Sequence, residues 1–286
     1  MIKTLKFILS ALVLGIALSS CGDASNEATT TRTFTGCFAI MRDSDNPTGR
    51  GYDKLTYEVK LNYTTGMAQI NIKDLQLDEN TTYNNVSIAD IPFKITKEGW
   101  VEVTSNKTVG VVAGSERELA LTGLDLRMCD RYIADSYYRV FYMNYTIDGQ
   151  YTVLSSPIAQ YQFGTTMSTS PEGVYETTAT DYVFGIDPKN MTFNLLIKNT
   201  AFVEQMPSMN ILLEKVPFTV SGSTLSFKAD EIVPKIGETP YPGYTITDLN
   251  GYLDLSTGMT MRFSCTPEKM PLDFNVSVDC KYTFSK

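Results

Sequence analysis

The sequence predicts an all-β protein, and three observations lead to that prediction. Apolar and polar residues alternate with a period of two in many short stretches, which is typical of strands with one buried face. The clearest stretches are residues 57–61, 68–72, 100–103, 192–197, 225–227 and 274–278. Tyr and Phe are abundant, at 17 and 14 residues, and suit cross-strand aromatic pairs. Beyond residue 33, no stretch has convincing helical periodicity.

Residues 1–20 have the features of a cleaved export signal. Lys3 and Lys6 precede an apolar run at residues 7–18, which is too short to span a bilayer comfortably. The run ends in Leu-Ser-Ser-Cys at Cys21, which resembles the lipobox of bacterial lipoproteins. In that family the thiol receives a diacylglycerol and the chain is cut just before it. The resemblance therefore implies lipidation at Cys21 and multiple acyl chains that anchor the protein to a membrane.

Residues 21–33 follow as a short polar segment without apolar periodicity. We expect a lipidated, flexible tether that separates a globular body from the membrane. The expected location is the bacterial outer membrane. Whether the anchor lies on the cell surface or on the periplasmic face stays open.

The pattern in the rest of the chain indicates two copies of one β-unit. With a constant offset of 125 residues, Tyr57 corresponds to Tyr182, and Ile-Pro-Phe at 91–93 corresponds to Val-Pro-Phe at 216–218. Apolar positions superpose on apolar positions without a gap, as a shared core requires. We therefore predict a tandem duplication.

The limits of the two units follow from their first and last residues. Thr-Gly-Cys-Phe at 35–38 matches Glu-Gly-Val-Tyr at 172–175, and the first unit then carries an insertion at residues 41–52. Tyr-Gln-Phe at 161–163 ends the first unit, and a Gly/Ser/Thr/Pro-rich linker at 164–173 follows. The predicted domains are residues 34–166, a divergent copy, and residues 167–286.

The second unit carries the motifs of a known family. They include Met-Pro at 206–207, Val-Pro-Phe at 216–218, the Pro- and Tyr-rich segment 237–251 and Met-Pro-Leu-Asp-Phe at 270–274. These motifs resemble the calycin-like (lipocalin-like) β-barrel lipoprotein domain of Bacteroidota over most of residues 172–284. The first unit has fewer of these motifs. The resemblance implies two up-and-down antiparallel barrels of about eight strands, each with a small interior cup. Strand patterns alone leave two β-sandwiches as the alternative.

Four cysteines remain after Cys21, namely Cys37, Cys129, Cys265 and Cys280. An exported protein can form disulfides, and two cysteines fall in each unit. The natural pairing is then Cys37 with Cys129 and Cys265 with Cys280. Four buried free thiols are the equally weighted alternative.

Composition excludes several function classes. The chain has no His, which excludes His-based triads, His general bases and His-ligated metal sites. A net charge of -8 argues against a nucleic-acid partner. Neither a Gly-x-Ser-x-Gly nucleophile motif nor a glycine-rich phosphate loop occurs. We therefore predict a protein that is not an enzyme and has no cofactor or metal.

Other candidate residues have simpler explanations. Asp43-Ser-Asp45-Asn46 resembles the start of a calcium loop, but Lys54 stands where a bidentate Glu is required, so we predict a turn. Trp100 lies in an alternating stretch and is predicted to be in the core. Six tyrosines crowd one region and suit either a glycan platform or, as we prefer, cross-strand packing. These are Tyr132, Tyr137, Tyr138, Tyr142, Tyr145 and Tyr151.

These observations predict a lipid-anchored, non-catalytic binding protein of the cell envelope that holds a small apolar molecule inside a barrel. The alternative is a surface glycan-binding, adhesion or scaffold lipoprotein whose barrels are filled by side chains. The expected partners are a membrane, through Cys21, and a ligand that the sequence does not identify.

Overall fold

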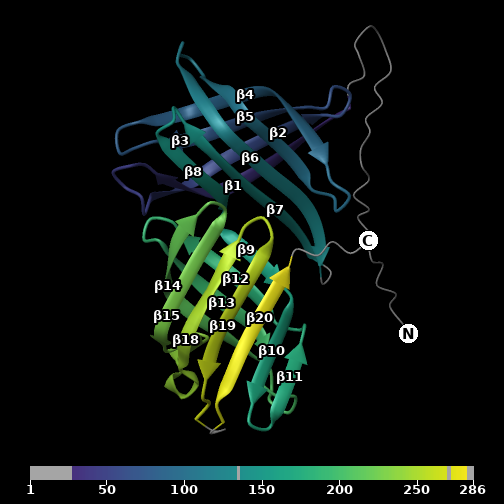
Figure 1. Cartoon of the computed structure of the whole chain (residues 1–286), viewed down its shortest axis with the longest axis vertical. Helices are drawn as coiled ribbons and strands as arrows, with labels where there is room; N and C mark the ends of the chain where they lie inside the picture. Colours follow the sequence, from purple (N-terminus) through teal and green to yellow (C-terminus); the bar gives the residue numbers. More distant parts are fainter. Residues whose placement is uncertain (1–27, 134–135, 269–271, 282–286) are drawn as a thin grey trace, which may run out of the picture.

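The protein consists of two β-lobes packed against each other (Figure 1). The computed structural model describes residues 28–133, 136–268 and 272–281, without side chains for 131–133, 136 and 137. The prediction of an all-β fold is confirmed: apart from the 3-10 turn η1 (Pro242–Tyr244), every element in these residues is a strand. Within the same ranges no helix is long and apolar enough to cross a membrane.

The first lobe is a closed barrel of eight antiparallel strands in up-and-down order. Each strand pairs with the next one along the chain, and the last strand pairs with the first. The strands are β1 (Thr29–Arg42), β2 (Arg50–Asn62), β3 (Met67–Gln76), β4 (Thr82–Ile95), β5 (Val101–Val112), β6 (Glu118–Ile133), β7 (Ser136–Ile147) and β8 (Tyr151–Pro157). This lobe is therefore a barrel and not a sandwich.

The interior of this barrel is packed with side chains. Alternation in β2 points Tyr57, Val59 and Leu61 inward, and all three are fully buried. Every strand of the barrel contributes buried residues to the same core cluster. An eight-stranded barrel is just wide enough for side chains to fill it, and here they do.

The second lobe is a curled antiparallel sheet in the order β11-β10-β20-β19-β18-β15-β14-β13-β12-β9. Its strands are β9 (Ala159–Phe163), β10 (Thr165–Ser170), β11 (Gly173–Thr177), β12 (Asp181–Asp187), β13 (Thr192–Thr200), β14 (Met209–Ser221), β15 (Thr224–Ile232), β18 (Ile246–Asp254), β19 (Gly258–Cys265) and β20 (Phe274–Lys281). Two short strands, β16 (Lys235–Ile236) and β17 (Thr239–Pro240), lie off this path.

A corner at Gly164 brings the two ends of the curled sheet together. Just before the corner β9 pairs with β12, and just after it β10 pairs with β20. A Cβ atom at Gly164 would lie 2.3 Å from the Asp279 carbonyl oxygen and 2.6 Å from the Cys280 Cα. Only glycine lets the backbones approach this closely.

The strand register repeats between the lobes with the predicted offset of 125 residues. Tyr57 pairs with Ile72 in the first lobe, and Tyr182 pairs with Ile197 in the second. The β3–β4 and β13–β14 ladders shift register at equivalent places, and so do the β6–β7 and β18–β19 ladders. Positive φ angles recur at equivalent positions, as in the pairs Asp74/Asn199, Asp90/Lys215 and Gly123/Asp248. Shared irregularities of this kind make the second lobe a copy of the first.

The same register corrects how the two copies begin. Ile40 pairs with Leu154 where Met167 pairs with Ser277, so β10 corresponds to the second half of β1 and Gly164 to Cys37. The segment 172–175 instead lies mainly in β11, an edge strand that corresponds to the start of β2. Residues 161–163 lie in β9 and pair with β12 of the second lobe. We therefore propose a boundary at residue 158 in place of the one near 166.

One end of the second lobe packs on the side of the barrel. Four outward-facing barrel residues belong to the core cluster of the second lobe; they are Phe38, Ile40, Tyr142 and Leu154. Arg42 Nη1 donates to the Val220 backbone oxygen at 3.1 Å, and Lys189 Nζ lies 2.9 Å from Asp53 Oδ1. The core of the second lobe thus extends onto the outer face of the barrel, while the barrel interior forms a separate cluster.

Candidate functional site

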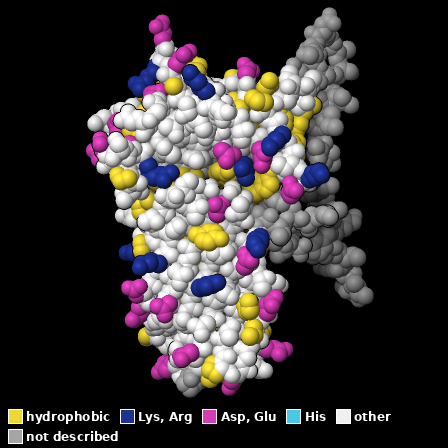
Figure 2. All heavy atoms as spheres, in the orientation of Figure 1, with side chains coloured by type: hydrophobic (Ala, Val, Ile, Leu, Met, Phe, Trp, Pro, Cys, Tyr) yellow, Lys and Arg dark blue, Asp and Glu magenta, His cyan; other side chains and the backbone are white. Residues whose placement is uncertain are grey.

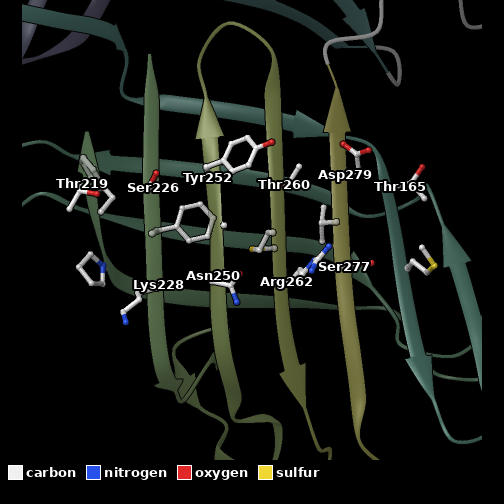
Figure 3. Close-up of a pocket in the computed structure, with 17 residues that line it drawn as sticks. Thr165, Thr219, Ser226, Lys228, Asn250, Tyr252, Thr260, Arg262, Ser277 and Asp279 are labelled. Atoms are coloured by element: carbon white, nitrogen blue, oxygen red, sulfur yellow. The ribbon is translucent and has the colours of Figure 1, made fainter. Parts of the chain in front are cut away.

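A hollow of about 1230 Å³ lies on the outer face of the second lobe (Figure 3). We call it the outer groove. It crosses six strands, β14, β15, β18, β19, β20 and β10. It is lined by Thr165, Met167, Pro217, Phe218, Thr219, Ser226, Phe227, Lys228, Asn250, Gly251, Tyr252, Thr260, Met261, Arg262, Ser277, Val278 and Asp279.

Strand register assembles the groove from two rows of outward residues, both visible in Figure 3. The first row, strand by strand, is Thr219, Ser226, Tyr252, Thr260, Asp279 and Thr165. The second row is Lys228, Asn250, Arg262, Ser277 and Met167. Between the rows, Phe227, Met261 and Val278 are buried because alternate side chains point into the core.

The hollow forms because most of the outward side chains are short. Ser226, Thr260 and Ser277 leave space around the longer Tyr252 and Arg262. In Figure 2, which faces these strands, the middle of the sheet is mostly white, the colour of the backbone and of side chains that are neither hydrophobic nor charged.

Gly251 keeps the floor of the groove low. A Cβ there would lie 2.4 Å from the Thr260 carbonyl oxygen and 2.8 Å from the Phe227 ring. The position therefore accepts only glycine, and the strands on either side stay close together.

The groove offers one exposed aromatic ring and two cations. Tyr252 is 43% exposed and Met167 is 39% exposed. Lys228 and Arg262 have no acidic partner among the described residues, whereas Asp279 pairs with Lys281 at 3.0 Å. Lys228 and Arg262 lie two strands apart, which separates their backbones by about 10 Å. The groove is thus locally cationic on a chain whose net charge is -8.

The outer groove is the counterpart of a surface that is buried in the first lobe. By register, the barrel residues Phe38, Ile40, Tyr142 and Leu154 correspond to Thr165, Met167, Thr260 and Ser277. The first set is covered by the second lobe, whereas the second set lines the open groove. One copy of this face is therefore a contact surface within the molecule, and the other is left open.

The four cysteines are free and buried. Cys265 pairs with Phe274 and Cys280 with Met259, which places the two thiols about 20 Å apart along the hairpin. A Cys265–Cys280 disulfide does not fit this register. Cys37 faces the barrel interior, three strands around the barrel from the strand that carries Cys129. Burial raises the pKa of Cys37, Cys265 and Cys280 to about 12, so these thiols are poor nucleophiles.

The described tyrosines of the predicted cluster pack against neighbouring side chains; Tyr142 and Tyr145 are buried, and Tyr138 and Tyr151 are half-buried. Tyr145 is buried in the barrel core, Tyr151 packs against that core, and the Tyr138 ring lies 4.9 Å from the Tyr161 ring. The Tyr142 hydroxyl donates to Asp125 Oδ2 at 2.5 Å, and burial together with this bond raises the pKa of Tyr142. The packing interpretation holds for these residues. The side chains of Tyr132 and Tyr137 lie outside the described set.

The Asp-rich loop forms a turn, as predicted. Asp43 Oδ1 accepts hydrogen bonds from the backbone N–H groups of Asp45 and Asn46, at 2.9 and 2.7 Å. In the part of the chain that the structure describes, no cluster of three or more His, Cys, Asp or Glu could hold a metal. Trp100 is buried, as expected, and Cys21 lies outside the described residues.

Sequence reasoning missed the outer groove. Its signal is the run of short hydroxyl side chains at the outward positions of β15, β19 and β20, interrupted by Tyr252 and Arg262. That signal has no meaning until the register joins the strands.

Comparisons with known proteins add little. No family model matches the chain, and no curated protein matches it. One similar solved structure is a double mutant of the vaccine antigen transferrin-binding protein B from Haemophilus parasuis Hp5, with 7% identity and a TM-score of 0.25. That match covers 88% of this chain and 76% of the other. A second is intact Ap-TbpB with its N and C lobes, at 9% identity, a TM-score of 0.24, and 89% and 77% coverage. At such scores these similarities carry no conclusion about the present chain.

Proposed function

We propose that this chain is a lipid-anchored, non-catalytic binding protein of the bacterial envelope, and that it binds an extended ligand along the outer groove. The observation that carries the proposal is the open groove itself, with the exposed Tyr252 ring beside two cations, Lys228 and Arg262, that have no acidic partner among the described residues. The lipobox at Cys21 and the calycin-like sequence motifs of the second lobe support the lipid anchor and the envelope location.

The groove residues fit an acidic glycan chain. The Tyr252 ring can stack on the C–H face of a sugar, and Lys228 and Arg262 can pair with carboxylates. Ser, Thr and Asn side chains along both rows supply hydrogen bonds to sugar hydroxyls. Six strands give a length of about 24 Å, which exceeds most small molecules and suits a polymer.

The barrel interiors offer less to a ligand. Buried side chains from all eight strands fill the first barrel. Phe38, Ile40, Tyr142 and Leu154 of the first lobe occupy the adjoining end of the second. We therefore favour the outer groove over an apolar ligand inside a barrel.

The test is affinity electrophoresis and titration calorimetry with a panel of acidic polysaccharides, each beside its carboxyl-reduced, neutral form. We expect at least one acidic glycan to bind and its reduced form to bind more weakly. Tyr252→Ala and Arg262→Ala should each weaken binding about tenfold, equivalent to ~1.4 kcal/mol. Val111→Ala, which alters an exposed residue of the first lobe, should leave binding unchanged. Equal binding by wild type and both groove variants would contradict the proposal.

A protein partner is the second candidate. It is favoured because the counterpart of the groove in the first lobe already binds a β-lobe within this molecule. In that case no glycan of the panel binds, and a Met167→Glu variant loses a cross-link to an envelope protein that wild type and Val111→Ala both form.

A further inference from the structure

The end of the first barrel where the described chain begins carries a group of exposed apolar side chains. Ile95 is 54% exposed, Tyr63 41% and Met67 39%. Tyr63 and Met67 lie beside β4, because the Tyr63 ring meets the Phe93 ring edge-on at 5.6 Å and Met67 pairs with Pro92. Ile95 lies two residues beyond Phe93 in the same strand. We call Tyr63, Met67, Pro92, Phe93 and Ile95 the apolar rim.

The apolar rim lies beside the point where the tether enters the barrel. The Tyr63 backbone N–H donates to the Ala28 carbonyl oxygen at 3.0 Å, and Thr30 Oγ1 donates to the Tyr63 hydroxyl at 3.2 Å. Cys21 lies seven positions before Ala28, with six residues between them. A seven-residue segment reaches at most about 24 Å, whatever its conformation. An acylated Cys21 would therefore keep the rim close to the bilayer surface.

The equivalent end of the second lobe is a covered contact surface. By the 125-residue offset, Tyr63 corresponds to Pro188, and Ile95 corresponds to Val220. Pro188 lies so close to the first lobe that a Cβ at Gly51 would meet its carbonyl oxygen, and the Val220 carbonyl accepts from Arg42. In the described part of the chain nothing covers this end of the first lobe in the same way. Tyr63 and Ile95 are larger than their counterparts Pro188 and Val220.

We infer that the apolar rim is a seat on the membrane, whose side chains enter the interfacial layer of the bilayer that holds the lipid anchor. This inference rests on the anchor proposed above. Tyr beside aliphatic side chains suits that layer, because the ring lies among apolar groups while its hydroxyl stays hydrated. The seat would fix the orientation of the barrel on the membrane in place of a loose tether.

The test places an environment-sensitive fluorophore, NBD, on the rim. Ile95→Cys introduces one exposed thiol, and the described native cysteines are buried and free, so labelling is selective. The full-length lipidated protein is reconstituted in vesicles of phosphatidylethanolamine and phosphatidylglycerol, and its acyl mass is confirmed by mass spectrometry. The matched control is Val111→Cys, which is 48% exposed near the opposite end of the same barrel.

We expect NBD emission at position 95 to shift to shorter wavelength and to be quenched by nitroxide-labelled lipid, while position 111 changes neither way. An acylated protein whose position 95 stays water-exposed overturns the seat and leaves the anchor intact. A chain without acyl mass overturns the anchor and the seat together. A shift at position 95 that occurs without vesicles as protein concentration rises shows that a second copy covers the rim, which also overturns the inference.

Discussion

At the residue scale, Asp254 illustrates how one side chain joins two hairpins of the second lobe. Its carboxylate accepts from Ser223 Oγ at 2.9 Å and Thr224 Oγ1 at 2.8 Å, across the β15–β18 pair. It also accepts from the backbone N–H groups of Ser256 and Thr257, at 2.8 and 3.0 Å. Burial opposes its ionisation, but these hydrogen bonds outweigh that effect and lower the pKa of Asp254.

Replacing this carboxylate should make the free energy of unfolding less dependent on pH in the acid range. We expect Asp254→Asn to destabilise the protein by about 1–3 kcal/mol at neutral pH, because bonds to a charged acceptor are lost. Because the pKa of this carboxyl is lower in the folded than in the unfolded protein, its charge stabilises the fold at pH values above the unfolded pKa of about 3.9. That contribution is lost as the pH falls through the folded pKa.

Urea unfolding between neutral pH and about pH 3 measures both effects, and the difference between wild type and variant should shrink towards the acid end. A difference that is absent at neutral pH, or constant across the range, contradicts this role for Asp254.

At the element scale, the corner between β9 and β10 decides how the second sheet closes. Gly164→Ala should cost about 1–3 kcal/mol, because the new methyl group would overlap the Asp279 carbonyl and the Cys280 Cα. The matched control is Gly185→Ala in β12, where the nearest atom to a new Cβ is 3.9 Å away.

Hydrogen exchange measures where each variant opens. Gly164→Ala should lose protection in β10 and β20, while Gly185→Ala keeps wild-type protection. Equal stability of the two alanine variants would show that the corner has no special geometry.

The elements also show what the sequence can and cannot predict. Alternation identified strands such as 68–72, and the 125-residue offset correctly paired Tyr57 with Tyr182. The start of the second copy was misplaced because Gly164 splits one long strand into β9 and β10, while 172–175 resembles 35–38 by chance. The groove was invisible, because Tyr252 and Arg262 become neighbours of distant residues only through the register of six strands.

At the scale of the whole molecule, four outward barrel residues are part of the core of the second lobe, so we expect the two lobes to unfold together. Leu154 is a barrel residue that is fully buried in the core of the second lobe. We expect the wild type to unfold in a single cooperative step, and Leu154→Ala to cost about 2–5 kcal/mol.

Trp100 is the one Trp of the chain and reports the first lobe, while far-UV circular dichroism reports both lobes. Trp100 fluorescence and circular dichroism should give coincident unfolding transitions in the wild type. In Leu154→Ala the two transitions should move to lower stability, either together or with a gap opening between them. Two well-resolved unfolding transitions in the wild type would show that the contact between the barrel and the core of the second lobe does not couple the lobes.

The two surfaces proposed here lie on different lobes. The apolar rim belongs to the first lobe, to which the tether is joined. The outer groove belongs to the second lobe, which follows later in the chain. This arrangement assigns attachment to one copy of the duplicated unit and recognition to the other. It accounts for the different side chains that the two copies carry on equivalent faces.

Recognition at the outer groove can be tested in cells with a photo-crosslinking amino acid at position 252. The control carries the same group at position 111, which is similarly exposed on the first lobe. We predict that irradiation gives an adduct at position 252 that migrates slowly and stains for carbohydrate, with none at position 111. Absence of a carbohydrate adduct at 252, or equal adducts at both positions, would exclude the outer groove as the glycan-binding surface.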